Sequence, residues 1–415
     1  MSSKVLNLRL AVLPVVAAMA IAVAGCGSSS SSSSASSSST AGGSSSSAST
    51  AKLPATINVT AVEDMSGPVA YVGKSVITGL QLAEKQINSS GLLHGSKIVM
   101  TVKDTGSQVS TATTQFASAL TSNSVAVFGP LLSGEALAVA PLAERAKTVD
   151  IAIESQTDGL LNIGPYIYRA TASQLRFDNL EPEYIAPKLT NKTVRILYDS
   201  ETSALQEAAQ QMAAKFKALG VKVLSVAGVP GTTTDFSSIA TKLEAGNPGA
   251  IGLLLIGTAN PAAITAVRNT GYKGLLFGNE AATNGSLKPA GSLANGFIYS
   301  VDYNPGLTFP SAVAFTKLFE ANYPGQTPDG YDATGYDAMN EFAHAIALSG
   351  SATRAGVQAG MQKLIASGGL NGAIGPEKFT GVGNRDLSVA GTLVEWENGK
   401  ETVIKVGNPN LTSQP

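Results

Sequence analysis

Residues 57–88 read INVTAVEDMSGPVAYVGKSVITGLQLAEKQIN, a short β-rich run followed by a longer apolar pattern. The run at 57–62 has the length and the β-branched content of a strand. The apolar residues after it recur at helical spacing: Ile77, Leu80, Ala83 and Ile87. This stretch therefore predicts a strand followed by a helix, the repeating unit of an α/β fold.

The same alternation continues along the chain. Further strands are predicted at 97–104, 125–129, 149–153, 166–170, 193–198, 221–226, 250–256 and 275–278, with helices at 109–121, 135–147, 204–219 and 236–245. Another helix is predicted with Asn260 as its N-cap, Pro261 as its first residue and Gly271 at its end. Strands that alternate with helices predict right-handed crossovers and parallel sheets covered on both faces.

The alternation stops near the C-terminus. Helices are predicted at 311–322, 333–348 and 353–365, before a hairpin with strands at 389–396 and 401–406 that turns at Asn398-Gly399. Because the strand-helix rhythm starts twice, two doubly wound lobes are predicted. A chain of 415 residues also exceeds what one hydrophobic core usually serves.

Charge and cysteine content disfavour several functions. The formal net charge is -1, charged residues are 14% of the chain, and neither half has a basic cluster, so nucleic acid is not an expected partner. With two histidines and one cysteine, Cys26, a tetrahedral zinc site would need carboxylates for most of its ligands. No metal and no cofactor are therefore expected.

The N-terminus has the pattern of an export signal. Two basic residues precede an apolar run at 10–23, which is shorter than a membrane span and leads to Val23-Ala24-Gly25-Cys26. This ending resembles the lipobox of bacterial lipoproteins, which implies cleavage before Cys26 and a lipid on its thiol. An ordinary secretory signal with an incidental cysteine is the alternative. We therefore expect a signal peptide at 1–25, and a lipidated Cys26 with a Ser-rich tether at 26–53.

The sequence has no recognisable catalytic motif. Residues 67–75, GPVAYVGKS, are similar to a P-loop, but five residues rather than four separate the two glycines. Gly381-Val382-Gly383 lacks the third glycine of a dinucleotide site. His94 and His344 have no evident nucleophile or acid partner, and neither GxSxG nor HExxH occurs. The protein is not expected to be an enzyme, although motif absence does not exclude a carboxylate-based hydrolase.

Several short motifs occur in the order found in one family. The first are Met65-Ser66-Gly67-Pro68-Val69-Ala70, Thr78-Gly79, and Ile87-Asn88 with Gly91. The later ones are Val127-Phe128-Gly129-Pro130 with Ser133, Tyr168-Arg169, Asp235-Phe236-Ser237 and Gly278-Asn279-Glu280. On these residues, the chain resembles the branched-chain amino acid binding proteins of ABC transporters from residue 57 to about 405.

The resemblance implies a type I periplasmic-binding fold. In this fold, two Rossmann-like lobes are joined by three crossing segments and enclose the ligand between them. The late helices would return to the first lobe, and the final hairpin would complete the second. The expected boundaries are crossings near Thr171, Val301 and Leu387, a first lobe at 54–171 and 302–386, and a second lobe at 172–301 and 387–410.

The first lobe is expected to bind the carboxylate of a ligand, because ligands of open parallel sheets bind beyond the carboxyl ends of the strands. Ser133 and Gly134 follow a strand and open a helix, so their N–H groups and the Ser133 hydroxyl can hold a carboxylate. The resemblance gives this role to the serine. Ser155, Gln156 and Thr157 follow the next strand, and the family's carboxylate-binding threonine aligns with Gln156.

The second lobe and the cleft walls provide the other expected contacts. Glu280 matches the family's acidic residue that pairs with the ligand ammonium group; a solvated loop glutamate is the alternative. Three aromatic wall residues of the family align with Val72, Ser203 and Thr258. Tyr71 is expected to replace one wall, with surface packing of a loop aromatic as the alternative. The pocket is therefore not restricted to leucine or valine, and a larger or more polar zwitterion is equally reasonable.

These expectations describe a lipid-anchored receptor that faces outside the cytoplasm, in the periplasm or at the cell surface. It would capture a small amino-acid-like molecule by closing two lobes around it. Its expected partners are the permease and ATPase of an ABC importer, and the membrane through Cys26; a monomer is expected. A ligand-sensing lipoprotein that reports solute occupancy to a signalling receptor is the alternative function.

Overall fold

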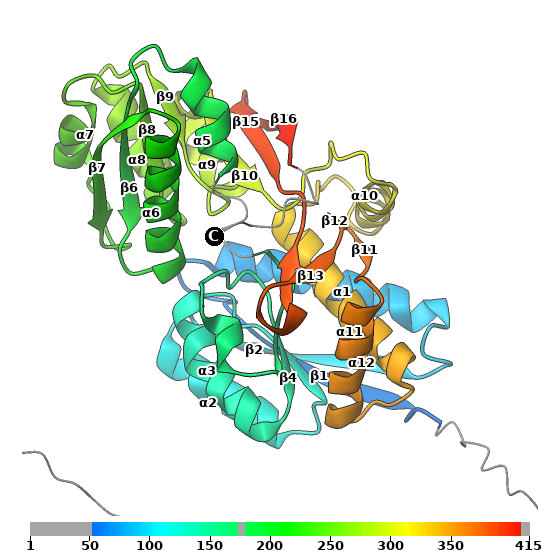
Figure 1. The fold of residues 1–415 in the computed structure, drawn as a ribbon. Helices are drawn as coiled ribbons and strands as arrows, with labels where there is room; N and C mark the ends of the chain where they lie inside the picture. Colours follow the sequence, from blue (N-terminus) through cyan, green and yellow to red (C-terminus); the bar gives the residue numbers. More distant parts are fainter. Residues whose placement is uncertain (1–51, 173–178, 408–415) are drawn as a thin grey trace, which may run out of the picture. The chain divides into compact units, whose positions relative to one another are not determined.

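The structure is a computed structural model that describes residues 52–172 and 179–407. Those residues contain two large open sheets, each covered by helices on both faces (Figure 1), and two small sheets of two strands each. The expected signal peptide, Cys26, the tether up to residue 51 and residues 408–410 lie outside the described residues. Within the described ranges, no helix combines enough length and apolar character to cross a membrane.

The first sheet has five parallel strands in the order β2-β1-β3-β4-β5. They are β1 (Thr56–Glu63), β2 (Lys97–Asp104), β3 (Ala126–Phe128), β4 (Val149–Ala152) and β5 (Ile167–Arg169). One face is covered by α2 (Val109–Thr121) and α3 (Ser133–Ala146), and the other by α1 (Ala70–Ser90), α11 (Gly330–Ser349) and α12 (Arg354–Ala366). The strand order reverses between β1 and β3, which is where open α/β sheets bind ligands.

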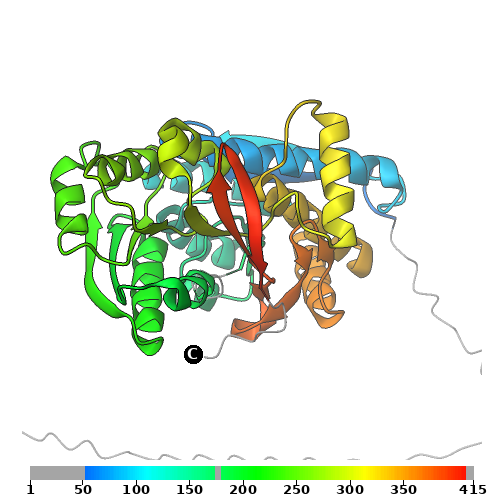
Figure 2. The same ribbon diagram turned by 90° about the horizontal axis from the view of Figure 1, so that it is seen from above.

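The second sheet repeats this order as β7-β6-β8-β9-β10, and the antiparallel hairpin β15–β16, red in Figure 2, extends it beside β10. The strands are β6 (Thr193–Asp199), β7 (Lys222–Val229), β8 (Ala250–Leu254), β9 (Leu275–Phe277), β10 (Phe297–Val301), β15 (Thr392–Glu397) and β16 (Lys400–Val406). One face is covered by α5 (Leu180–Ile185) and α6 (Ser203–Ala218), and the other by α7 (Ser237–Glu244), α8 (Ala259–Asn269) and α9 (Asn284–Leu287). The repeated rhythm in the sequence therefore corresponds to a repeated strand order.

The remaining helix and strands lie around the segments that connect the two sheets. They are α10 (Pro310–Asn322), β11 (Asn371–Gly372), β12 (Gly375–Pro376), β13 (Lys378–Thr380) and β14 (Asp386–Ser388). Short 3₁₀ helices occur at Leu160–Ile163, Ala186–Lys188, Lys288–Ala294 and Val382–Asn384, and the first three contribute to the cores of the two sheets. Ala172, just after β5, forms a parallel bridge with Leu387 in β14. Both side chains belong to the apolar cluster around Phe315 of α10.

Helices α1 and α11 approach each other closely although they lie far apart in the sequence. A Cβ atom at Gly79 would collide with the carbonyl oxygen of Asp332, and one at Gly335 would collide with that of Val76. The same face of α11 packs on the first sheet, where the Phe342 and Phe128 rings meet edge to face at 5.7 Å. This packing fixes the first turns of α1 and α11 near the carboxyl ends of the strands.

The order and type of the predicted strands and helices are confirmed, and most boundaries differ by one to three residues. The predicted N-cap Asn260 is wrong: α8 begins at Ala259 after Thr258, and the buried Asn260 amide donates a hydrogen bond to the carbonyl of Leu255. The elements that were not predicted are α5, α9, β10, the short strands β11 to β14 and the 3₁₀ helices.

Candidate functional site

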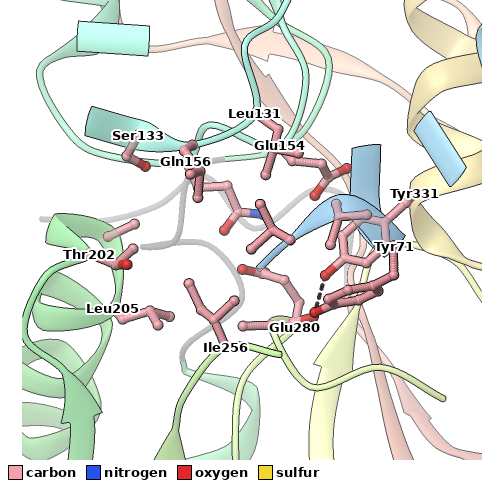
Figure 3. Close-up of a pocket in the computed structure, with 15 residues that line it drawn as sticks. Tyr71, Leu131, Ser133, Glu154, Gln156, Thr202, Leu205, Ile256, Glu280 and Tyr331 are labelled. Carbon is pink, nitrogen blue, oxygen red and sulfur yellow. Dashed lines mark hydrogen bonds between the residues drawn. The ribbon is translucent and has the colours of Figure 1, made fainter. Parts of the chain in front are cut away.

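A cavity of about 70 Å³ lies between the carboxyl ends of the two sheets (Figure 3). Its polar lining residues are Tyr71, Ser133, Glu154, Gln156, Thr202 and Glu280. Leu131, Leu205, Ile256 and the ring of Tyr331 supply much of the apolar wall. The cavity volume is several times the roughly 10–15 Å³ that one water needs. Among the described residues that line the cavity, none is Lys, Arg or His.

Ser133 is the first residue of α3, and it is buried against the cavity. The first hydrogen bond that α3 makes to its own start runs from the Ala136 N–H to the Leu132 carbonyl. The N–H groups before it have no acceptor within the helix, and they carry the positive end of the helix dipole. This end of the cavity can therefore accept a negatively charged oxygen.

Glu280 follows β9 and is only 9% exposed, so the alternative of a solvated loop residue is wrong. Its side chain lines the cavity, and its carbonyl oxygen accepts a hydrogen bond of 3.3 Å from the Tyr331 hydroxyl. Tyr331 lies in the first turn of α11. The second sheet and helix α11 are thus joined directly beside the cavity (Figure 3).

Glu154, which follows β4, is a lining residue that sequence reasoning missed. Its carboxylate accepts a hydrogen bond from the Thr334 hydroxyl of α11. Burial raises the pKa of the Glu154 carboxyl well above its usual range, and the nearby carboxyls of Asp302, Glu280 and Asp329 raise it further. The rule that pointed to residues 155–157 applies equally to Glu154, because it also follows the strand.

Gln156 lines the cavity and takes part in a buried hydrogen-bond chain. Its amide nitrogen donates to the Thr171 hydroxyl at 3.2 Å, and that hydroxyl donates to the Asp302 carboxylate at 3.1 Å. Thr171 follows β5 and Asp302 follows β10. Gln156 is therefore connected to two of the segments at which the chain was predicted to cross between lobes.

Two tyrosine rings form one side of the cavity. Tyr71 lies in the first turn of α1, and its ring meets that of Tyr331 edge to face with centroids 6.5 Å apart. Burial raises the pKa of the Tyr71 hydroxyl to about 12. Tyr71 is thus a helical residue of the cavity wall, and the alternative of a loop aromatic packed on the surface is wrong.

The other predicted site residues do not line this cavity. Gly134 and Thr258 line an adjoining hollow of about 500 Å³ that also borders on Ser133. Ser155 is fully buried. The Thr157 hydroxyl lies 3.1 Å from that of Ser203, and Ser203 borders a separate surface hollow. Near the positions expected for Ser203 and Thr258, Thr202 and Ile256 line the cavity instead.

The chemical groups of the cavity are not those of a metal centre. In residues 52–172 and 179–407, no set of three or more His, Cys, Asp and Glu side chains is arranged to hold a metal ion. The cavity instead combines a helix N-terminus, carboxyl groups and tyrosine rings. Such a combination is suited to a small polar molecule, and the residues lining the cavity include no paired nucleophile and base.

The sequence profile described as periplasmic binding protein matches residues 56–401. The chain is 25% identical over 305 residues to the Leu/Ile/Val-binding protein homolog 7 of Brucella abortus (strain 2308). This alignment covers 69% of this chain and 75% of that relative. The homologues and structural neighbours are solute-binding proteins, not enzymes.

Solved structures of similar fold extend this comparison. The branched-chain amino acid transporter substrate binding protein LivJ of Streptococcus pneumoniae, in complex with isoleucine, aligns with a TM-score of 0.77 at 21% identity, over 85% of this chain and 99% of that one. A solute binding protein of an ABC transporter from R. palustris, in complex with benzoate, aligns with a TM-score of 0.74 at 20% identity, over 85% and 96%. The fold is therefore that of type I periplasmic binding proteins.

Proposed function

The chain belongs to the periplasmic binding protein family, whose members act outside the cytoplasm, and we propose that it is the receptor of an ABC importer for an amino-acid-like solute. The ligand carboxylate would lie at the start of α3, and its ammonium group would pair with Glu280. The permease and ATPase of the importer would be its partners, and the receptor would act as a monomer.

The observation that carries this proposal is the opposed polarity of the cavity. Ser133 and the first N–H groups of α3, which have no acceptor within the helix, favour a carboxylate at one end. The buried Glu280 favours a cation at the other. An amino acid zwitterion carries both charges within one small molecule, whereas an aromatic acid such as benzoate carries only the negative one.

Closure of two lobes around the ligand is the proposed binding step. The proposed lobes are 54–171 with 302–386, and 172–301 with 387–410. The two sheets, the α1–α11 packing and the bridge between Ala172 and Leu387 support these boundaries. Because Ser133 and Glu280 come from different sheets, a ligand that contacts both favours the closed arrangement.

We further propose that the receptor is anchored to the outer face of the cell membrane by a lipid on Cys26. The apolar run at 10–23 and the motif that ends in Cys26 support this proposal. Metabolic labelling with a radioactive fatty acid should label the wild-type protein and leave Cys26→Ser unlabelled. Equal labelling of both would contradict the anchor.

A thermal-shift screen of L-amino acids tests the binding proposal, because a ligand that binds only the folded state raises the melting temperature. The best ligand should then bind Ser133→Ala and Glu280→Gln about 10- to 100-fold more weakly in calorimetry, since each change removes a hydrogen bond to a charged group. Ser118→Ala, at an exposed position on α2, is the matched control. A response to benzoate and to no amino acid would refute the proposal.

A further inference from the structure

Glu154 is a second acidic side chain in the cavity, and the proposed pairing of Glu280 with one ammonium group does not use it. Its φ of +68° lies in the left-handed region, which residues other than glycine seldom adopt. Such a conformation persists where the surrounding structure holds it, and the hydrogen bond from Thr334 helps to do so here. The carboxyl is therefore kept at the cavity rather than released to solvent.

Among the described residues, several acidic groups act on Glu154. Asp302 after β10, Glu280 after β9 and Asp329 before α11 all place carboxyls near it. The described lining residues provide no Lys, Arg or His to oppose this charge. A cationic group in the cavity would therefore be attracted by more than one carboxyl.

Gln156 provides an independent observation that points to the same kind of ligand. It is 2% exposed, and its Oε1 has no hydrogen-bond partner among the described residues. When the Thr171 hydroxyl donates to Asp302, it can only accept from Gln156, so the amide must turn its nitrogen to Thr171. The amide oxygen is then left for the cavity, toward which Figure 3 shows the side chain pointing.

A buried acceptor that lacks a donor is unfavourable, and a ligand that supplies N–H groups removes this penalty. Ammonium and guanidinium groups consist only of donors, whereas a neutral aliphatic side chain supplies none. The rings of Tyr71 and Tyr331 also favour a cation beside them.

From these contacts, we propose that the ligand is an amino acid whose side chain carries a second cationic group, held by Glu154 and Gln156. The proposal rests on the proposed function, since Ser133 and Glu280 would hold the α-carboxylate and the α-ammonium group. Glu154 is then the residue that determines preference for a basic side chain.

Two pairs of ligands that differ mainly in side-chain charge test the proposal on the wild-type full chain. L-Arginine is compared with L-citrulline, and L-lysine with L-norleucine, by calorimetric titration. The cationic member of each pair should bind about 10- to 100-fold more tightly. If the neutral members bind equally or more tightly, the inference is refuted and the proposed function stands. If no L-amino acid binds, both are refuted.

A variant then assigns the preference to a residue. Glu154→Gln keeps the size of the side chain and can still accept from Thr334, and it should reduce the arginine-to-citrulline preference about tenfold or more. Glu84→Gln is the matched control, because Glu84 is a half-buried glutamate on α1 whose carboxyl accepts from the Met100 N–H away from the cavity. An unchanged preference in folded Glu154→Gln would refute the role of Glu154. The ligand pairs on the wild type keep the proposal testable if that variant does not fold.

Discussion

The two sheets share one strand order but differ in the residues at the carboxyl ends of their strands. Beyond the first sheet, the cavity receives a helix N-terminus, a carboxyl and an amide, from Ser133, Glu154 and Gln156. Beyond the second, it receives apolar side chains such as Leu205 and Ile256, with Glu280 as the acidic group. The scaffold therefore places the strand ends, and the residues after each strand decide what each half can bind.

The sheets also differ in how their helical layers are assembled. The second sheet is covered by helices that alternate with its own strands, whereas the first depends on α11 and α12, which follow it by more than 150 residues. Buried acids are also concentrated at the first sheet, where Glu63, Asp64 and Asp150 all have raised pKa values, chiefly because of burial. Each difference can be tested by matched substitutions in the two halves.

The strongest effect should come from the long-range helical layer. Phe342→Ala removes the α11 ring that packs on Phe128, and Phe216→Ala removes the α6 ring that packs on Phe277 at 5.4 Å. Each cavity in the core should lower the free energy of unfolding by about 3–5 kcal/mol in urea denaturation. Hydrogen exchange should accelerate mainly in β1 to β5 for Phe342→Ala, and mainly in β6 to β10 for Phe216→Ala.

Exposed Val99→Ala provides a control that should change the free energy of unfolding little. If Phe342→Ala loosened both sheets equally, the first sheet would not depend specially on α11, and the contrast between the halves would be lost.

An intermediate effect is expected from the buried carboxyl of Glu135 in α3. Burial, and secondly the charge of Asp64, raise the pKa of Glu135 to about 8. The folded state therefore keeps this proton while the unfolded state loses it near its usual value of 4.5. Stability should fall as pH rises from about 4.5 to 8, and Glu135→Gln should remove a contribution of about 2–4 kcal/mol from that fall.

Glu181 in α5 is the corresponding buried acid at the second sheet, and burial raises its pKa to about 7. The loss of stability that Glu181 causes as pH rises is therefore complete near pH 7, one unit below the value for Glu135. Glu181→Gln should accordingly reduce the pH dependence of the unfolding free energy less than Glu135→Gln does. Urea denaturation at half-unit steps of pH measures both. A larger effect from Glu181→Gln would contradict the concentration of buried acids with raised pKa values at the first sheet.

The weakest effect should come from one of the hydrogen bonds that link the two halves, the one beside the cavity. Tyr331→Phe removes the 3.3 Å hydrogen bond to the Glu280 carbonyl and should cost about 0.5–1.5 kcal/mol of unfolding free energy. Tyr323→Phe, at the end of α10 and away from the cavity, is the control and should cost less. If both variants unfolded at the same urea concentration as the wild type, the link would contribute nothing to stability.

The fold could be predicted from the sequence because its main signal is local. Apolar periodicity distinguished strands such as 57–62 from the helices that follow them, and glycine and proline marked several ends. The repeated strand order follows from that alternation. β10 was not predicted, although Phe297–Val301 is rich in β-forming residues. The prediction of Asn260 as an N-cap was wrong because its buried side chain donates a hydrogen bond to the Leu255 carbonyl instead.

Part of the site could be predicted from strand ends and from the family resemblance. Ser133 and Gln156 follow strands, Glu280 matches the family's acidic residue, and Tyr71 was expected to replace an aromatic wall; all four line the cavity. Tyr331 was missed because α11 brings it to Tyr71 through packing between residues 260 positions apart in the chain. A shift of one or two residues at a helix start decides whether Thr202 or Ser203 faces the cavity, and periodicity does not resolve helix starts so finely.

A crystal structure of the protein with L-arginine would show whether one ligand is held between the two sheets. We predict electron density in the cavity, with the α-carboxylate at the start of α3, the α-ammonium group at the Glu280 carboxylate and the guanidinium group at Glu154. Density confined to the adjoining hollow near Gly134 and Thr258, with the cavity filled only by water, would refute this arrangement.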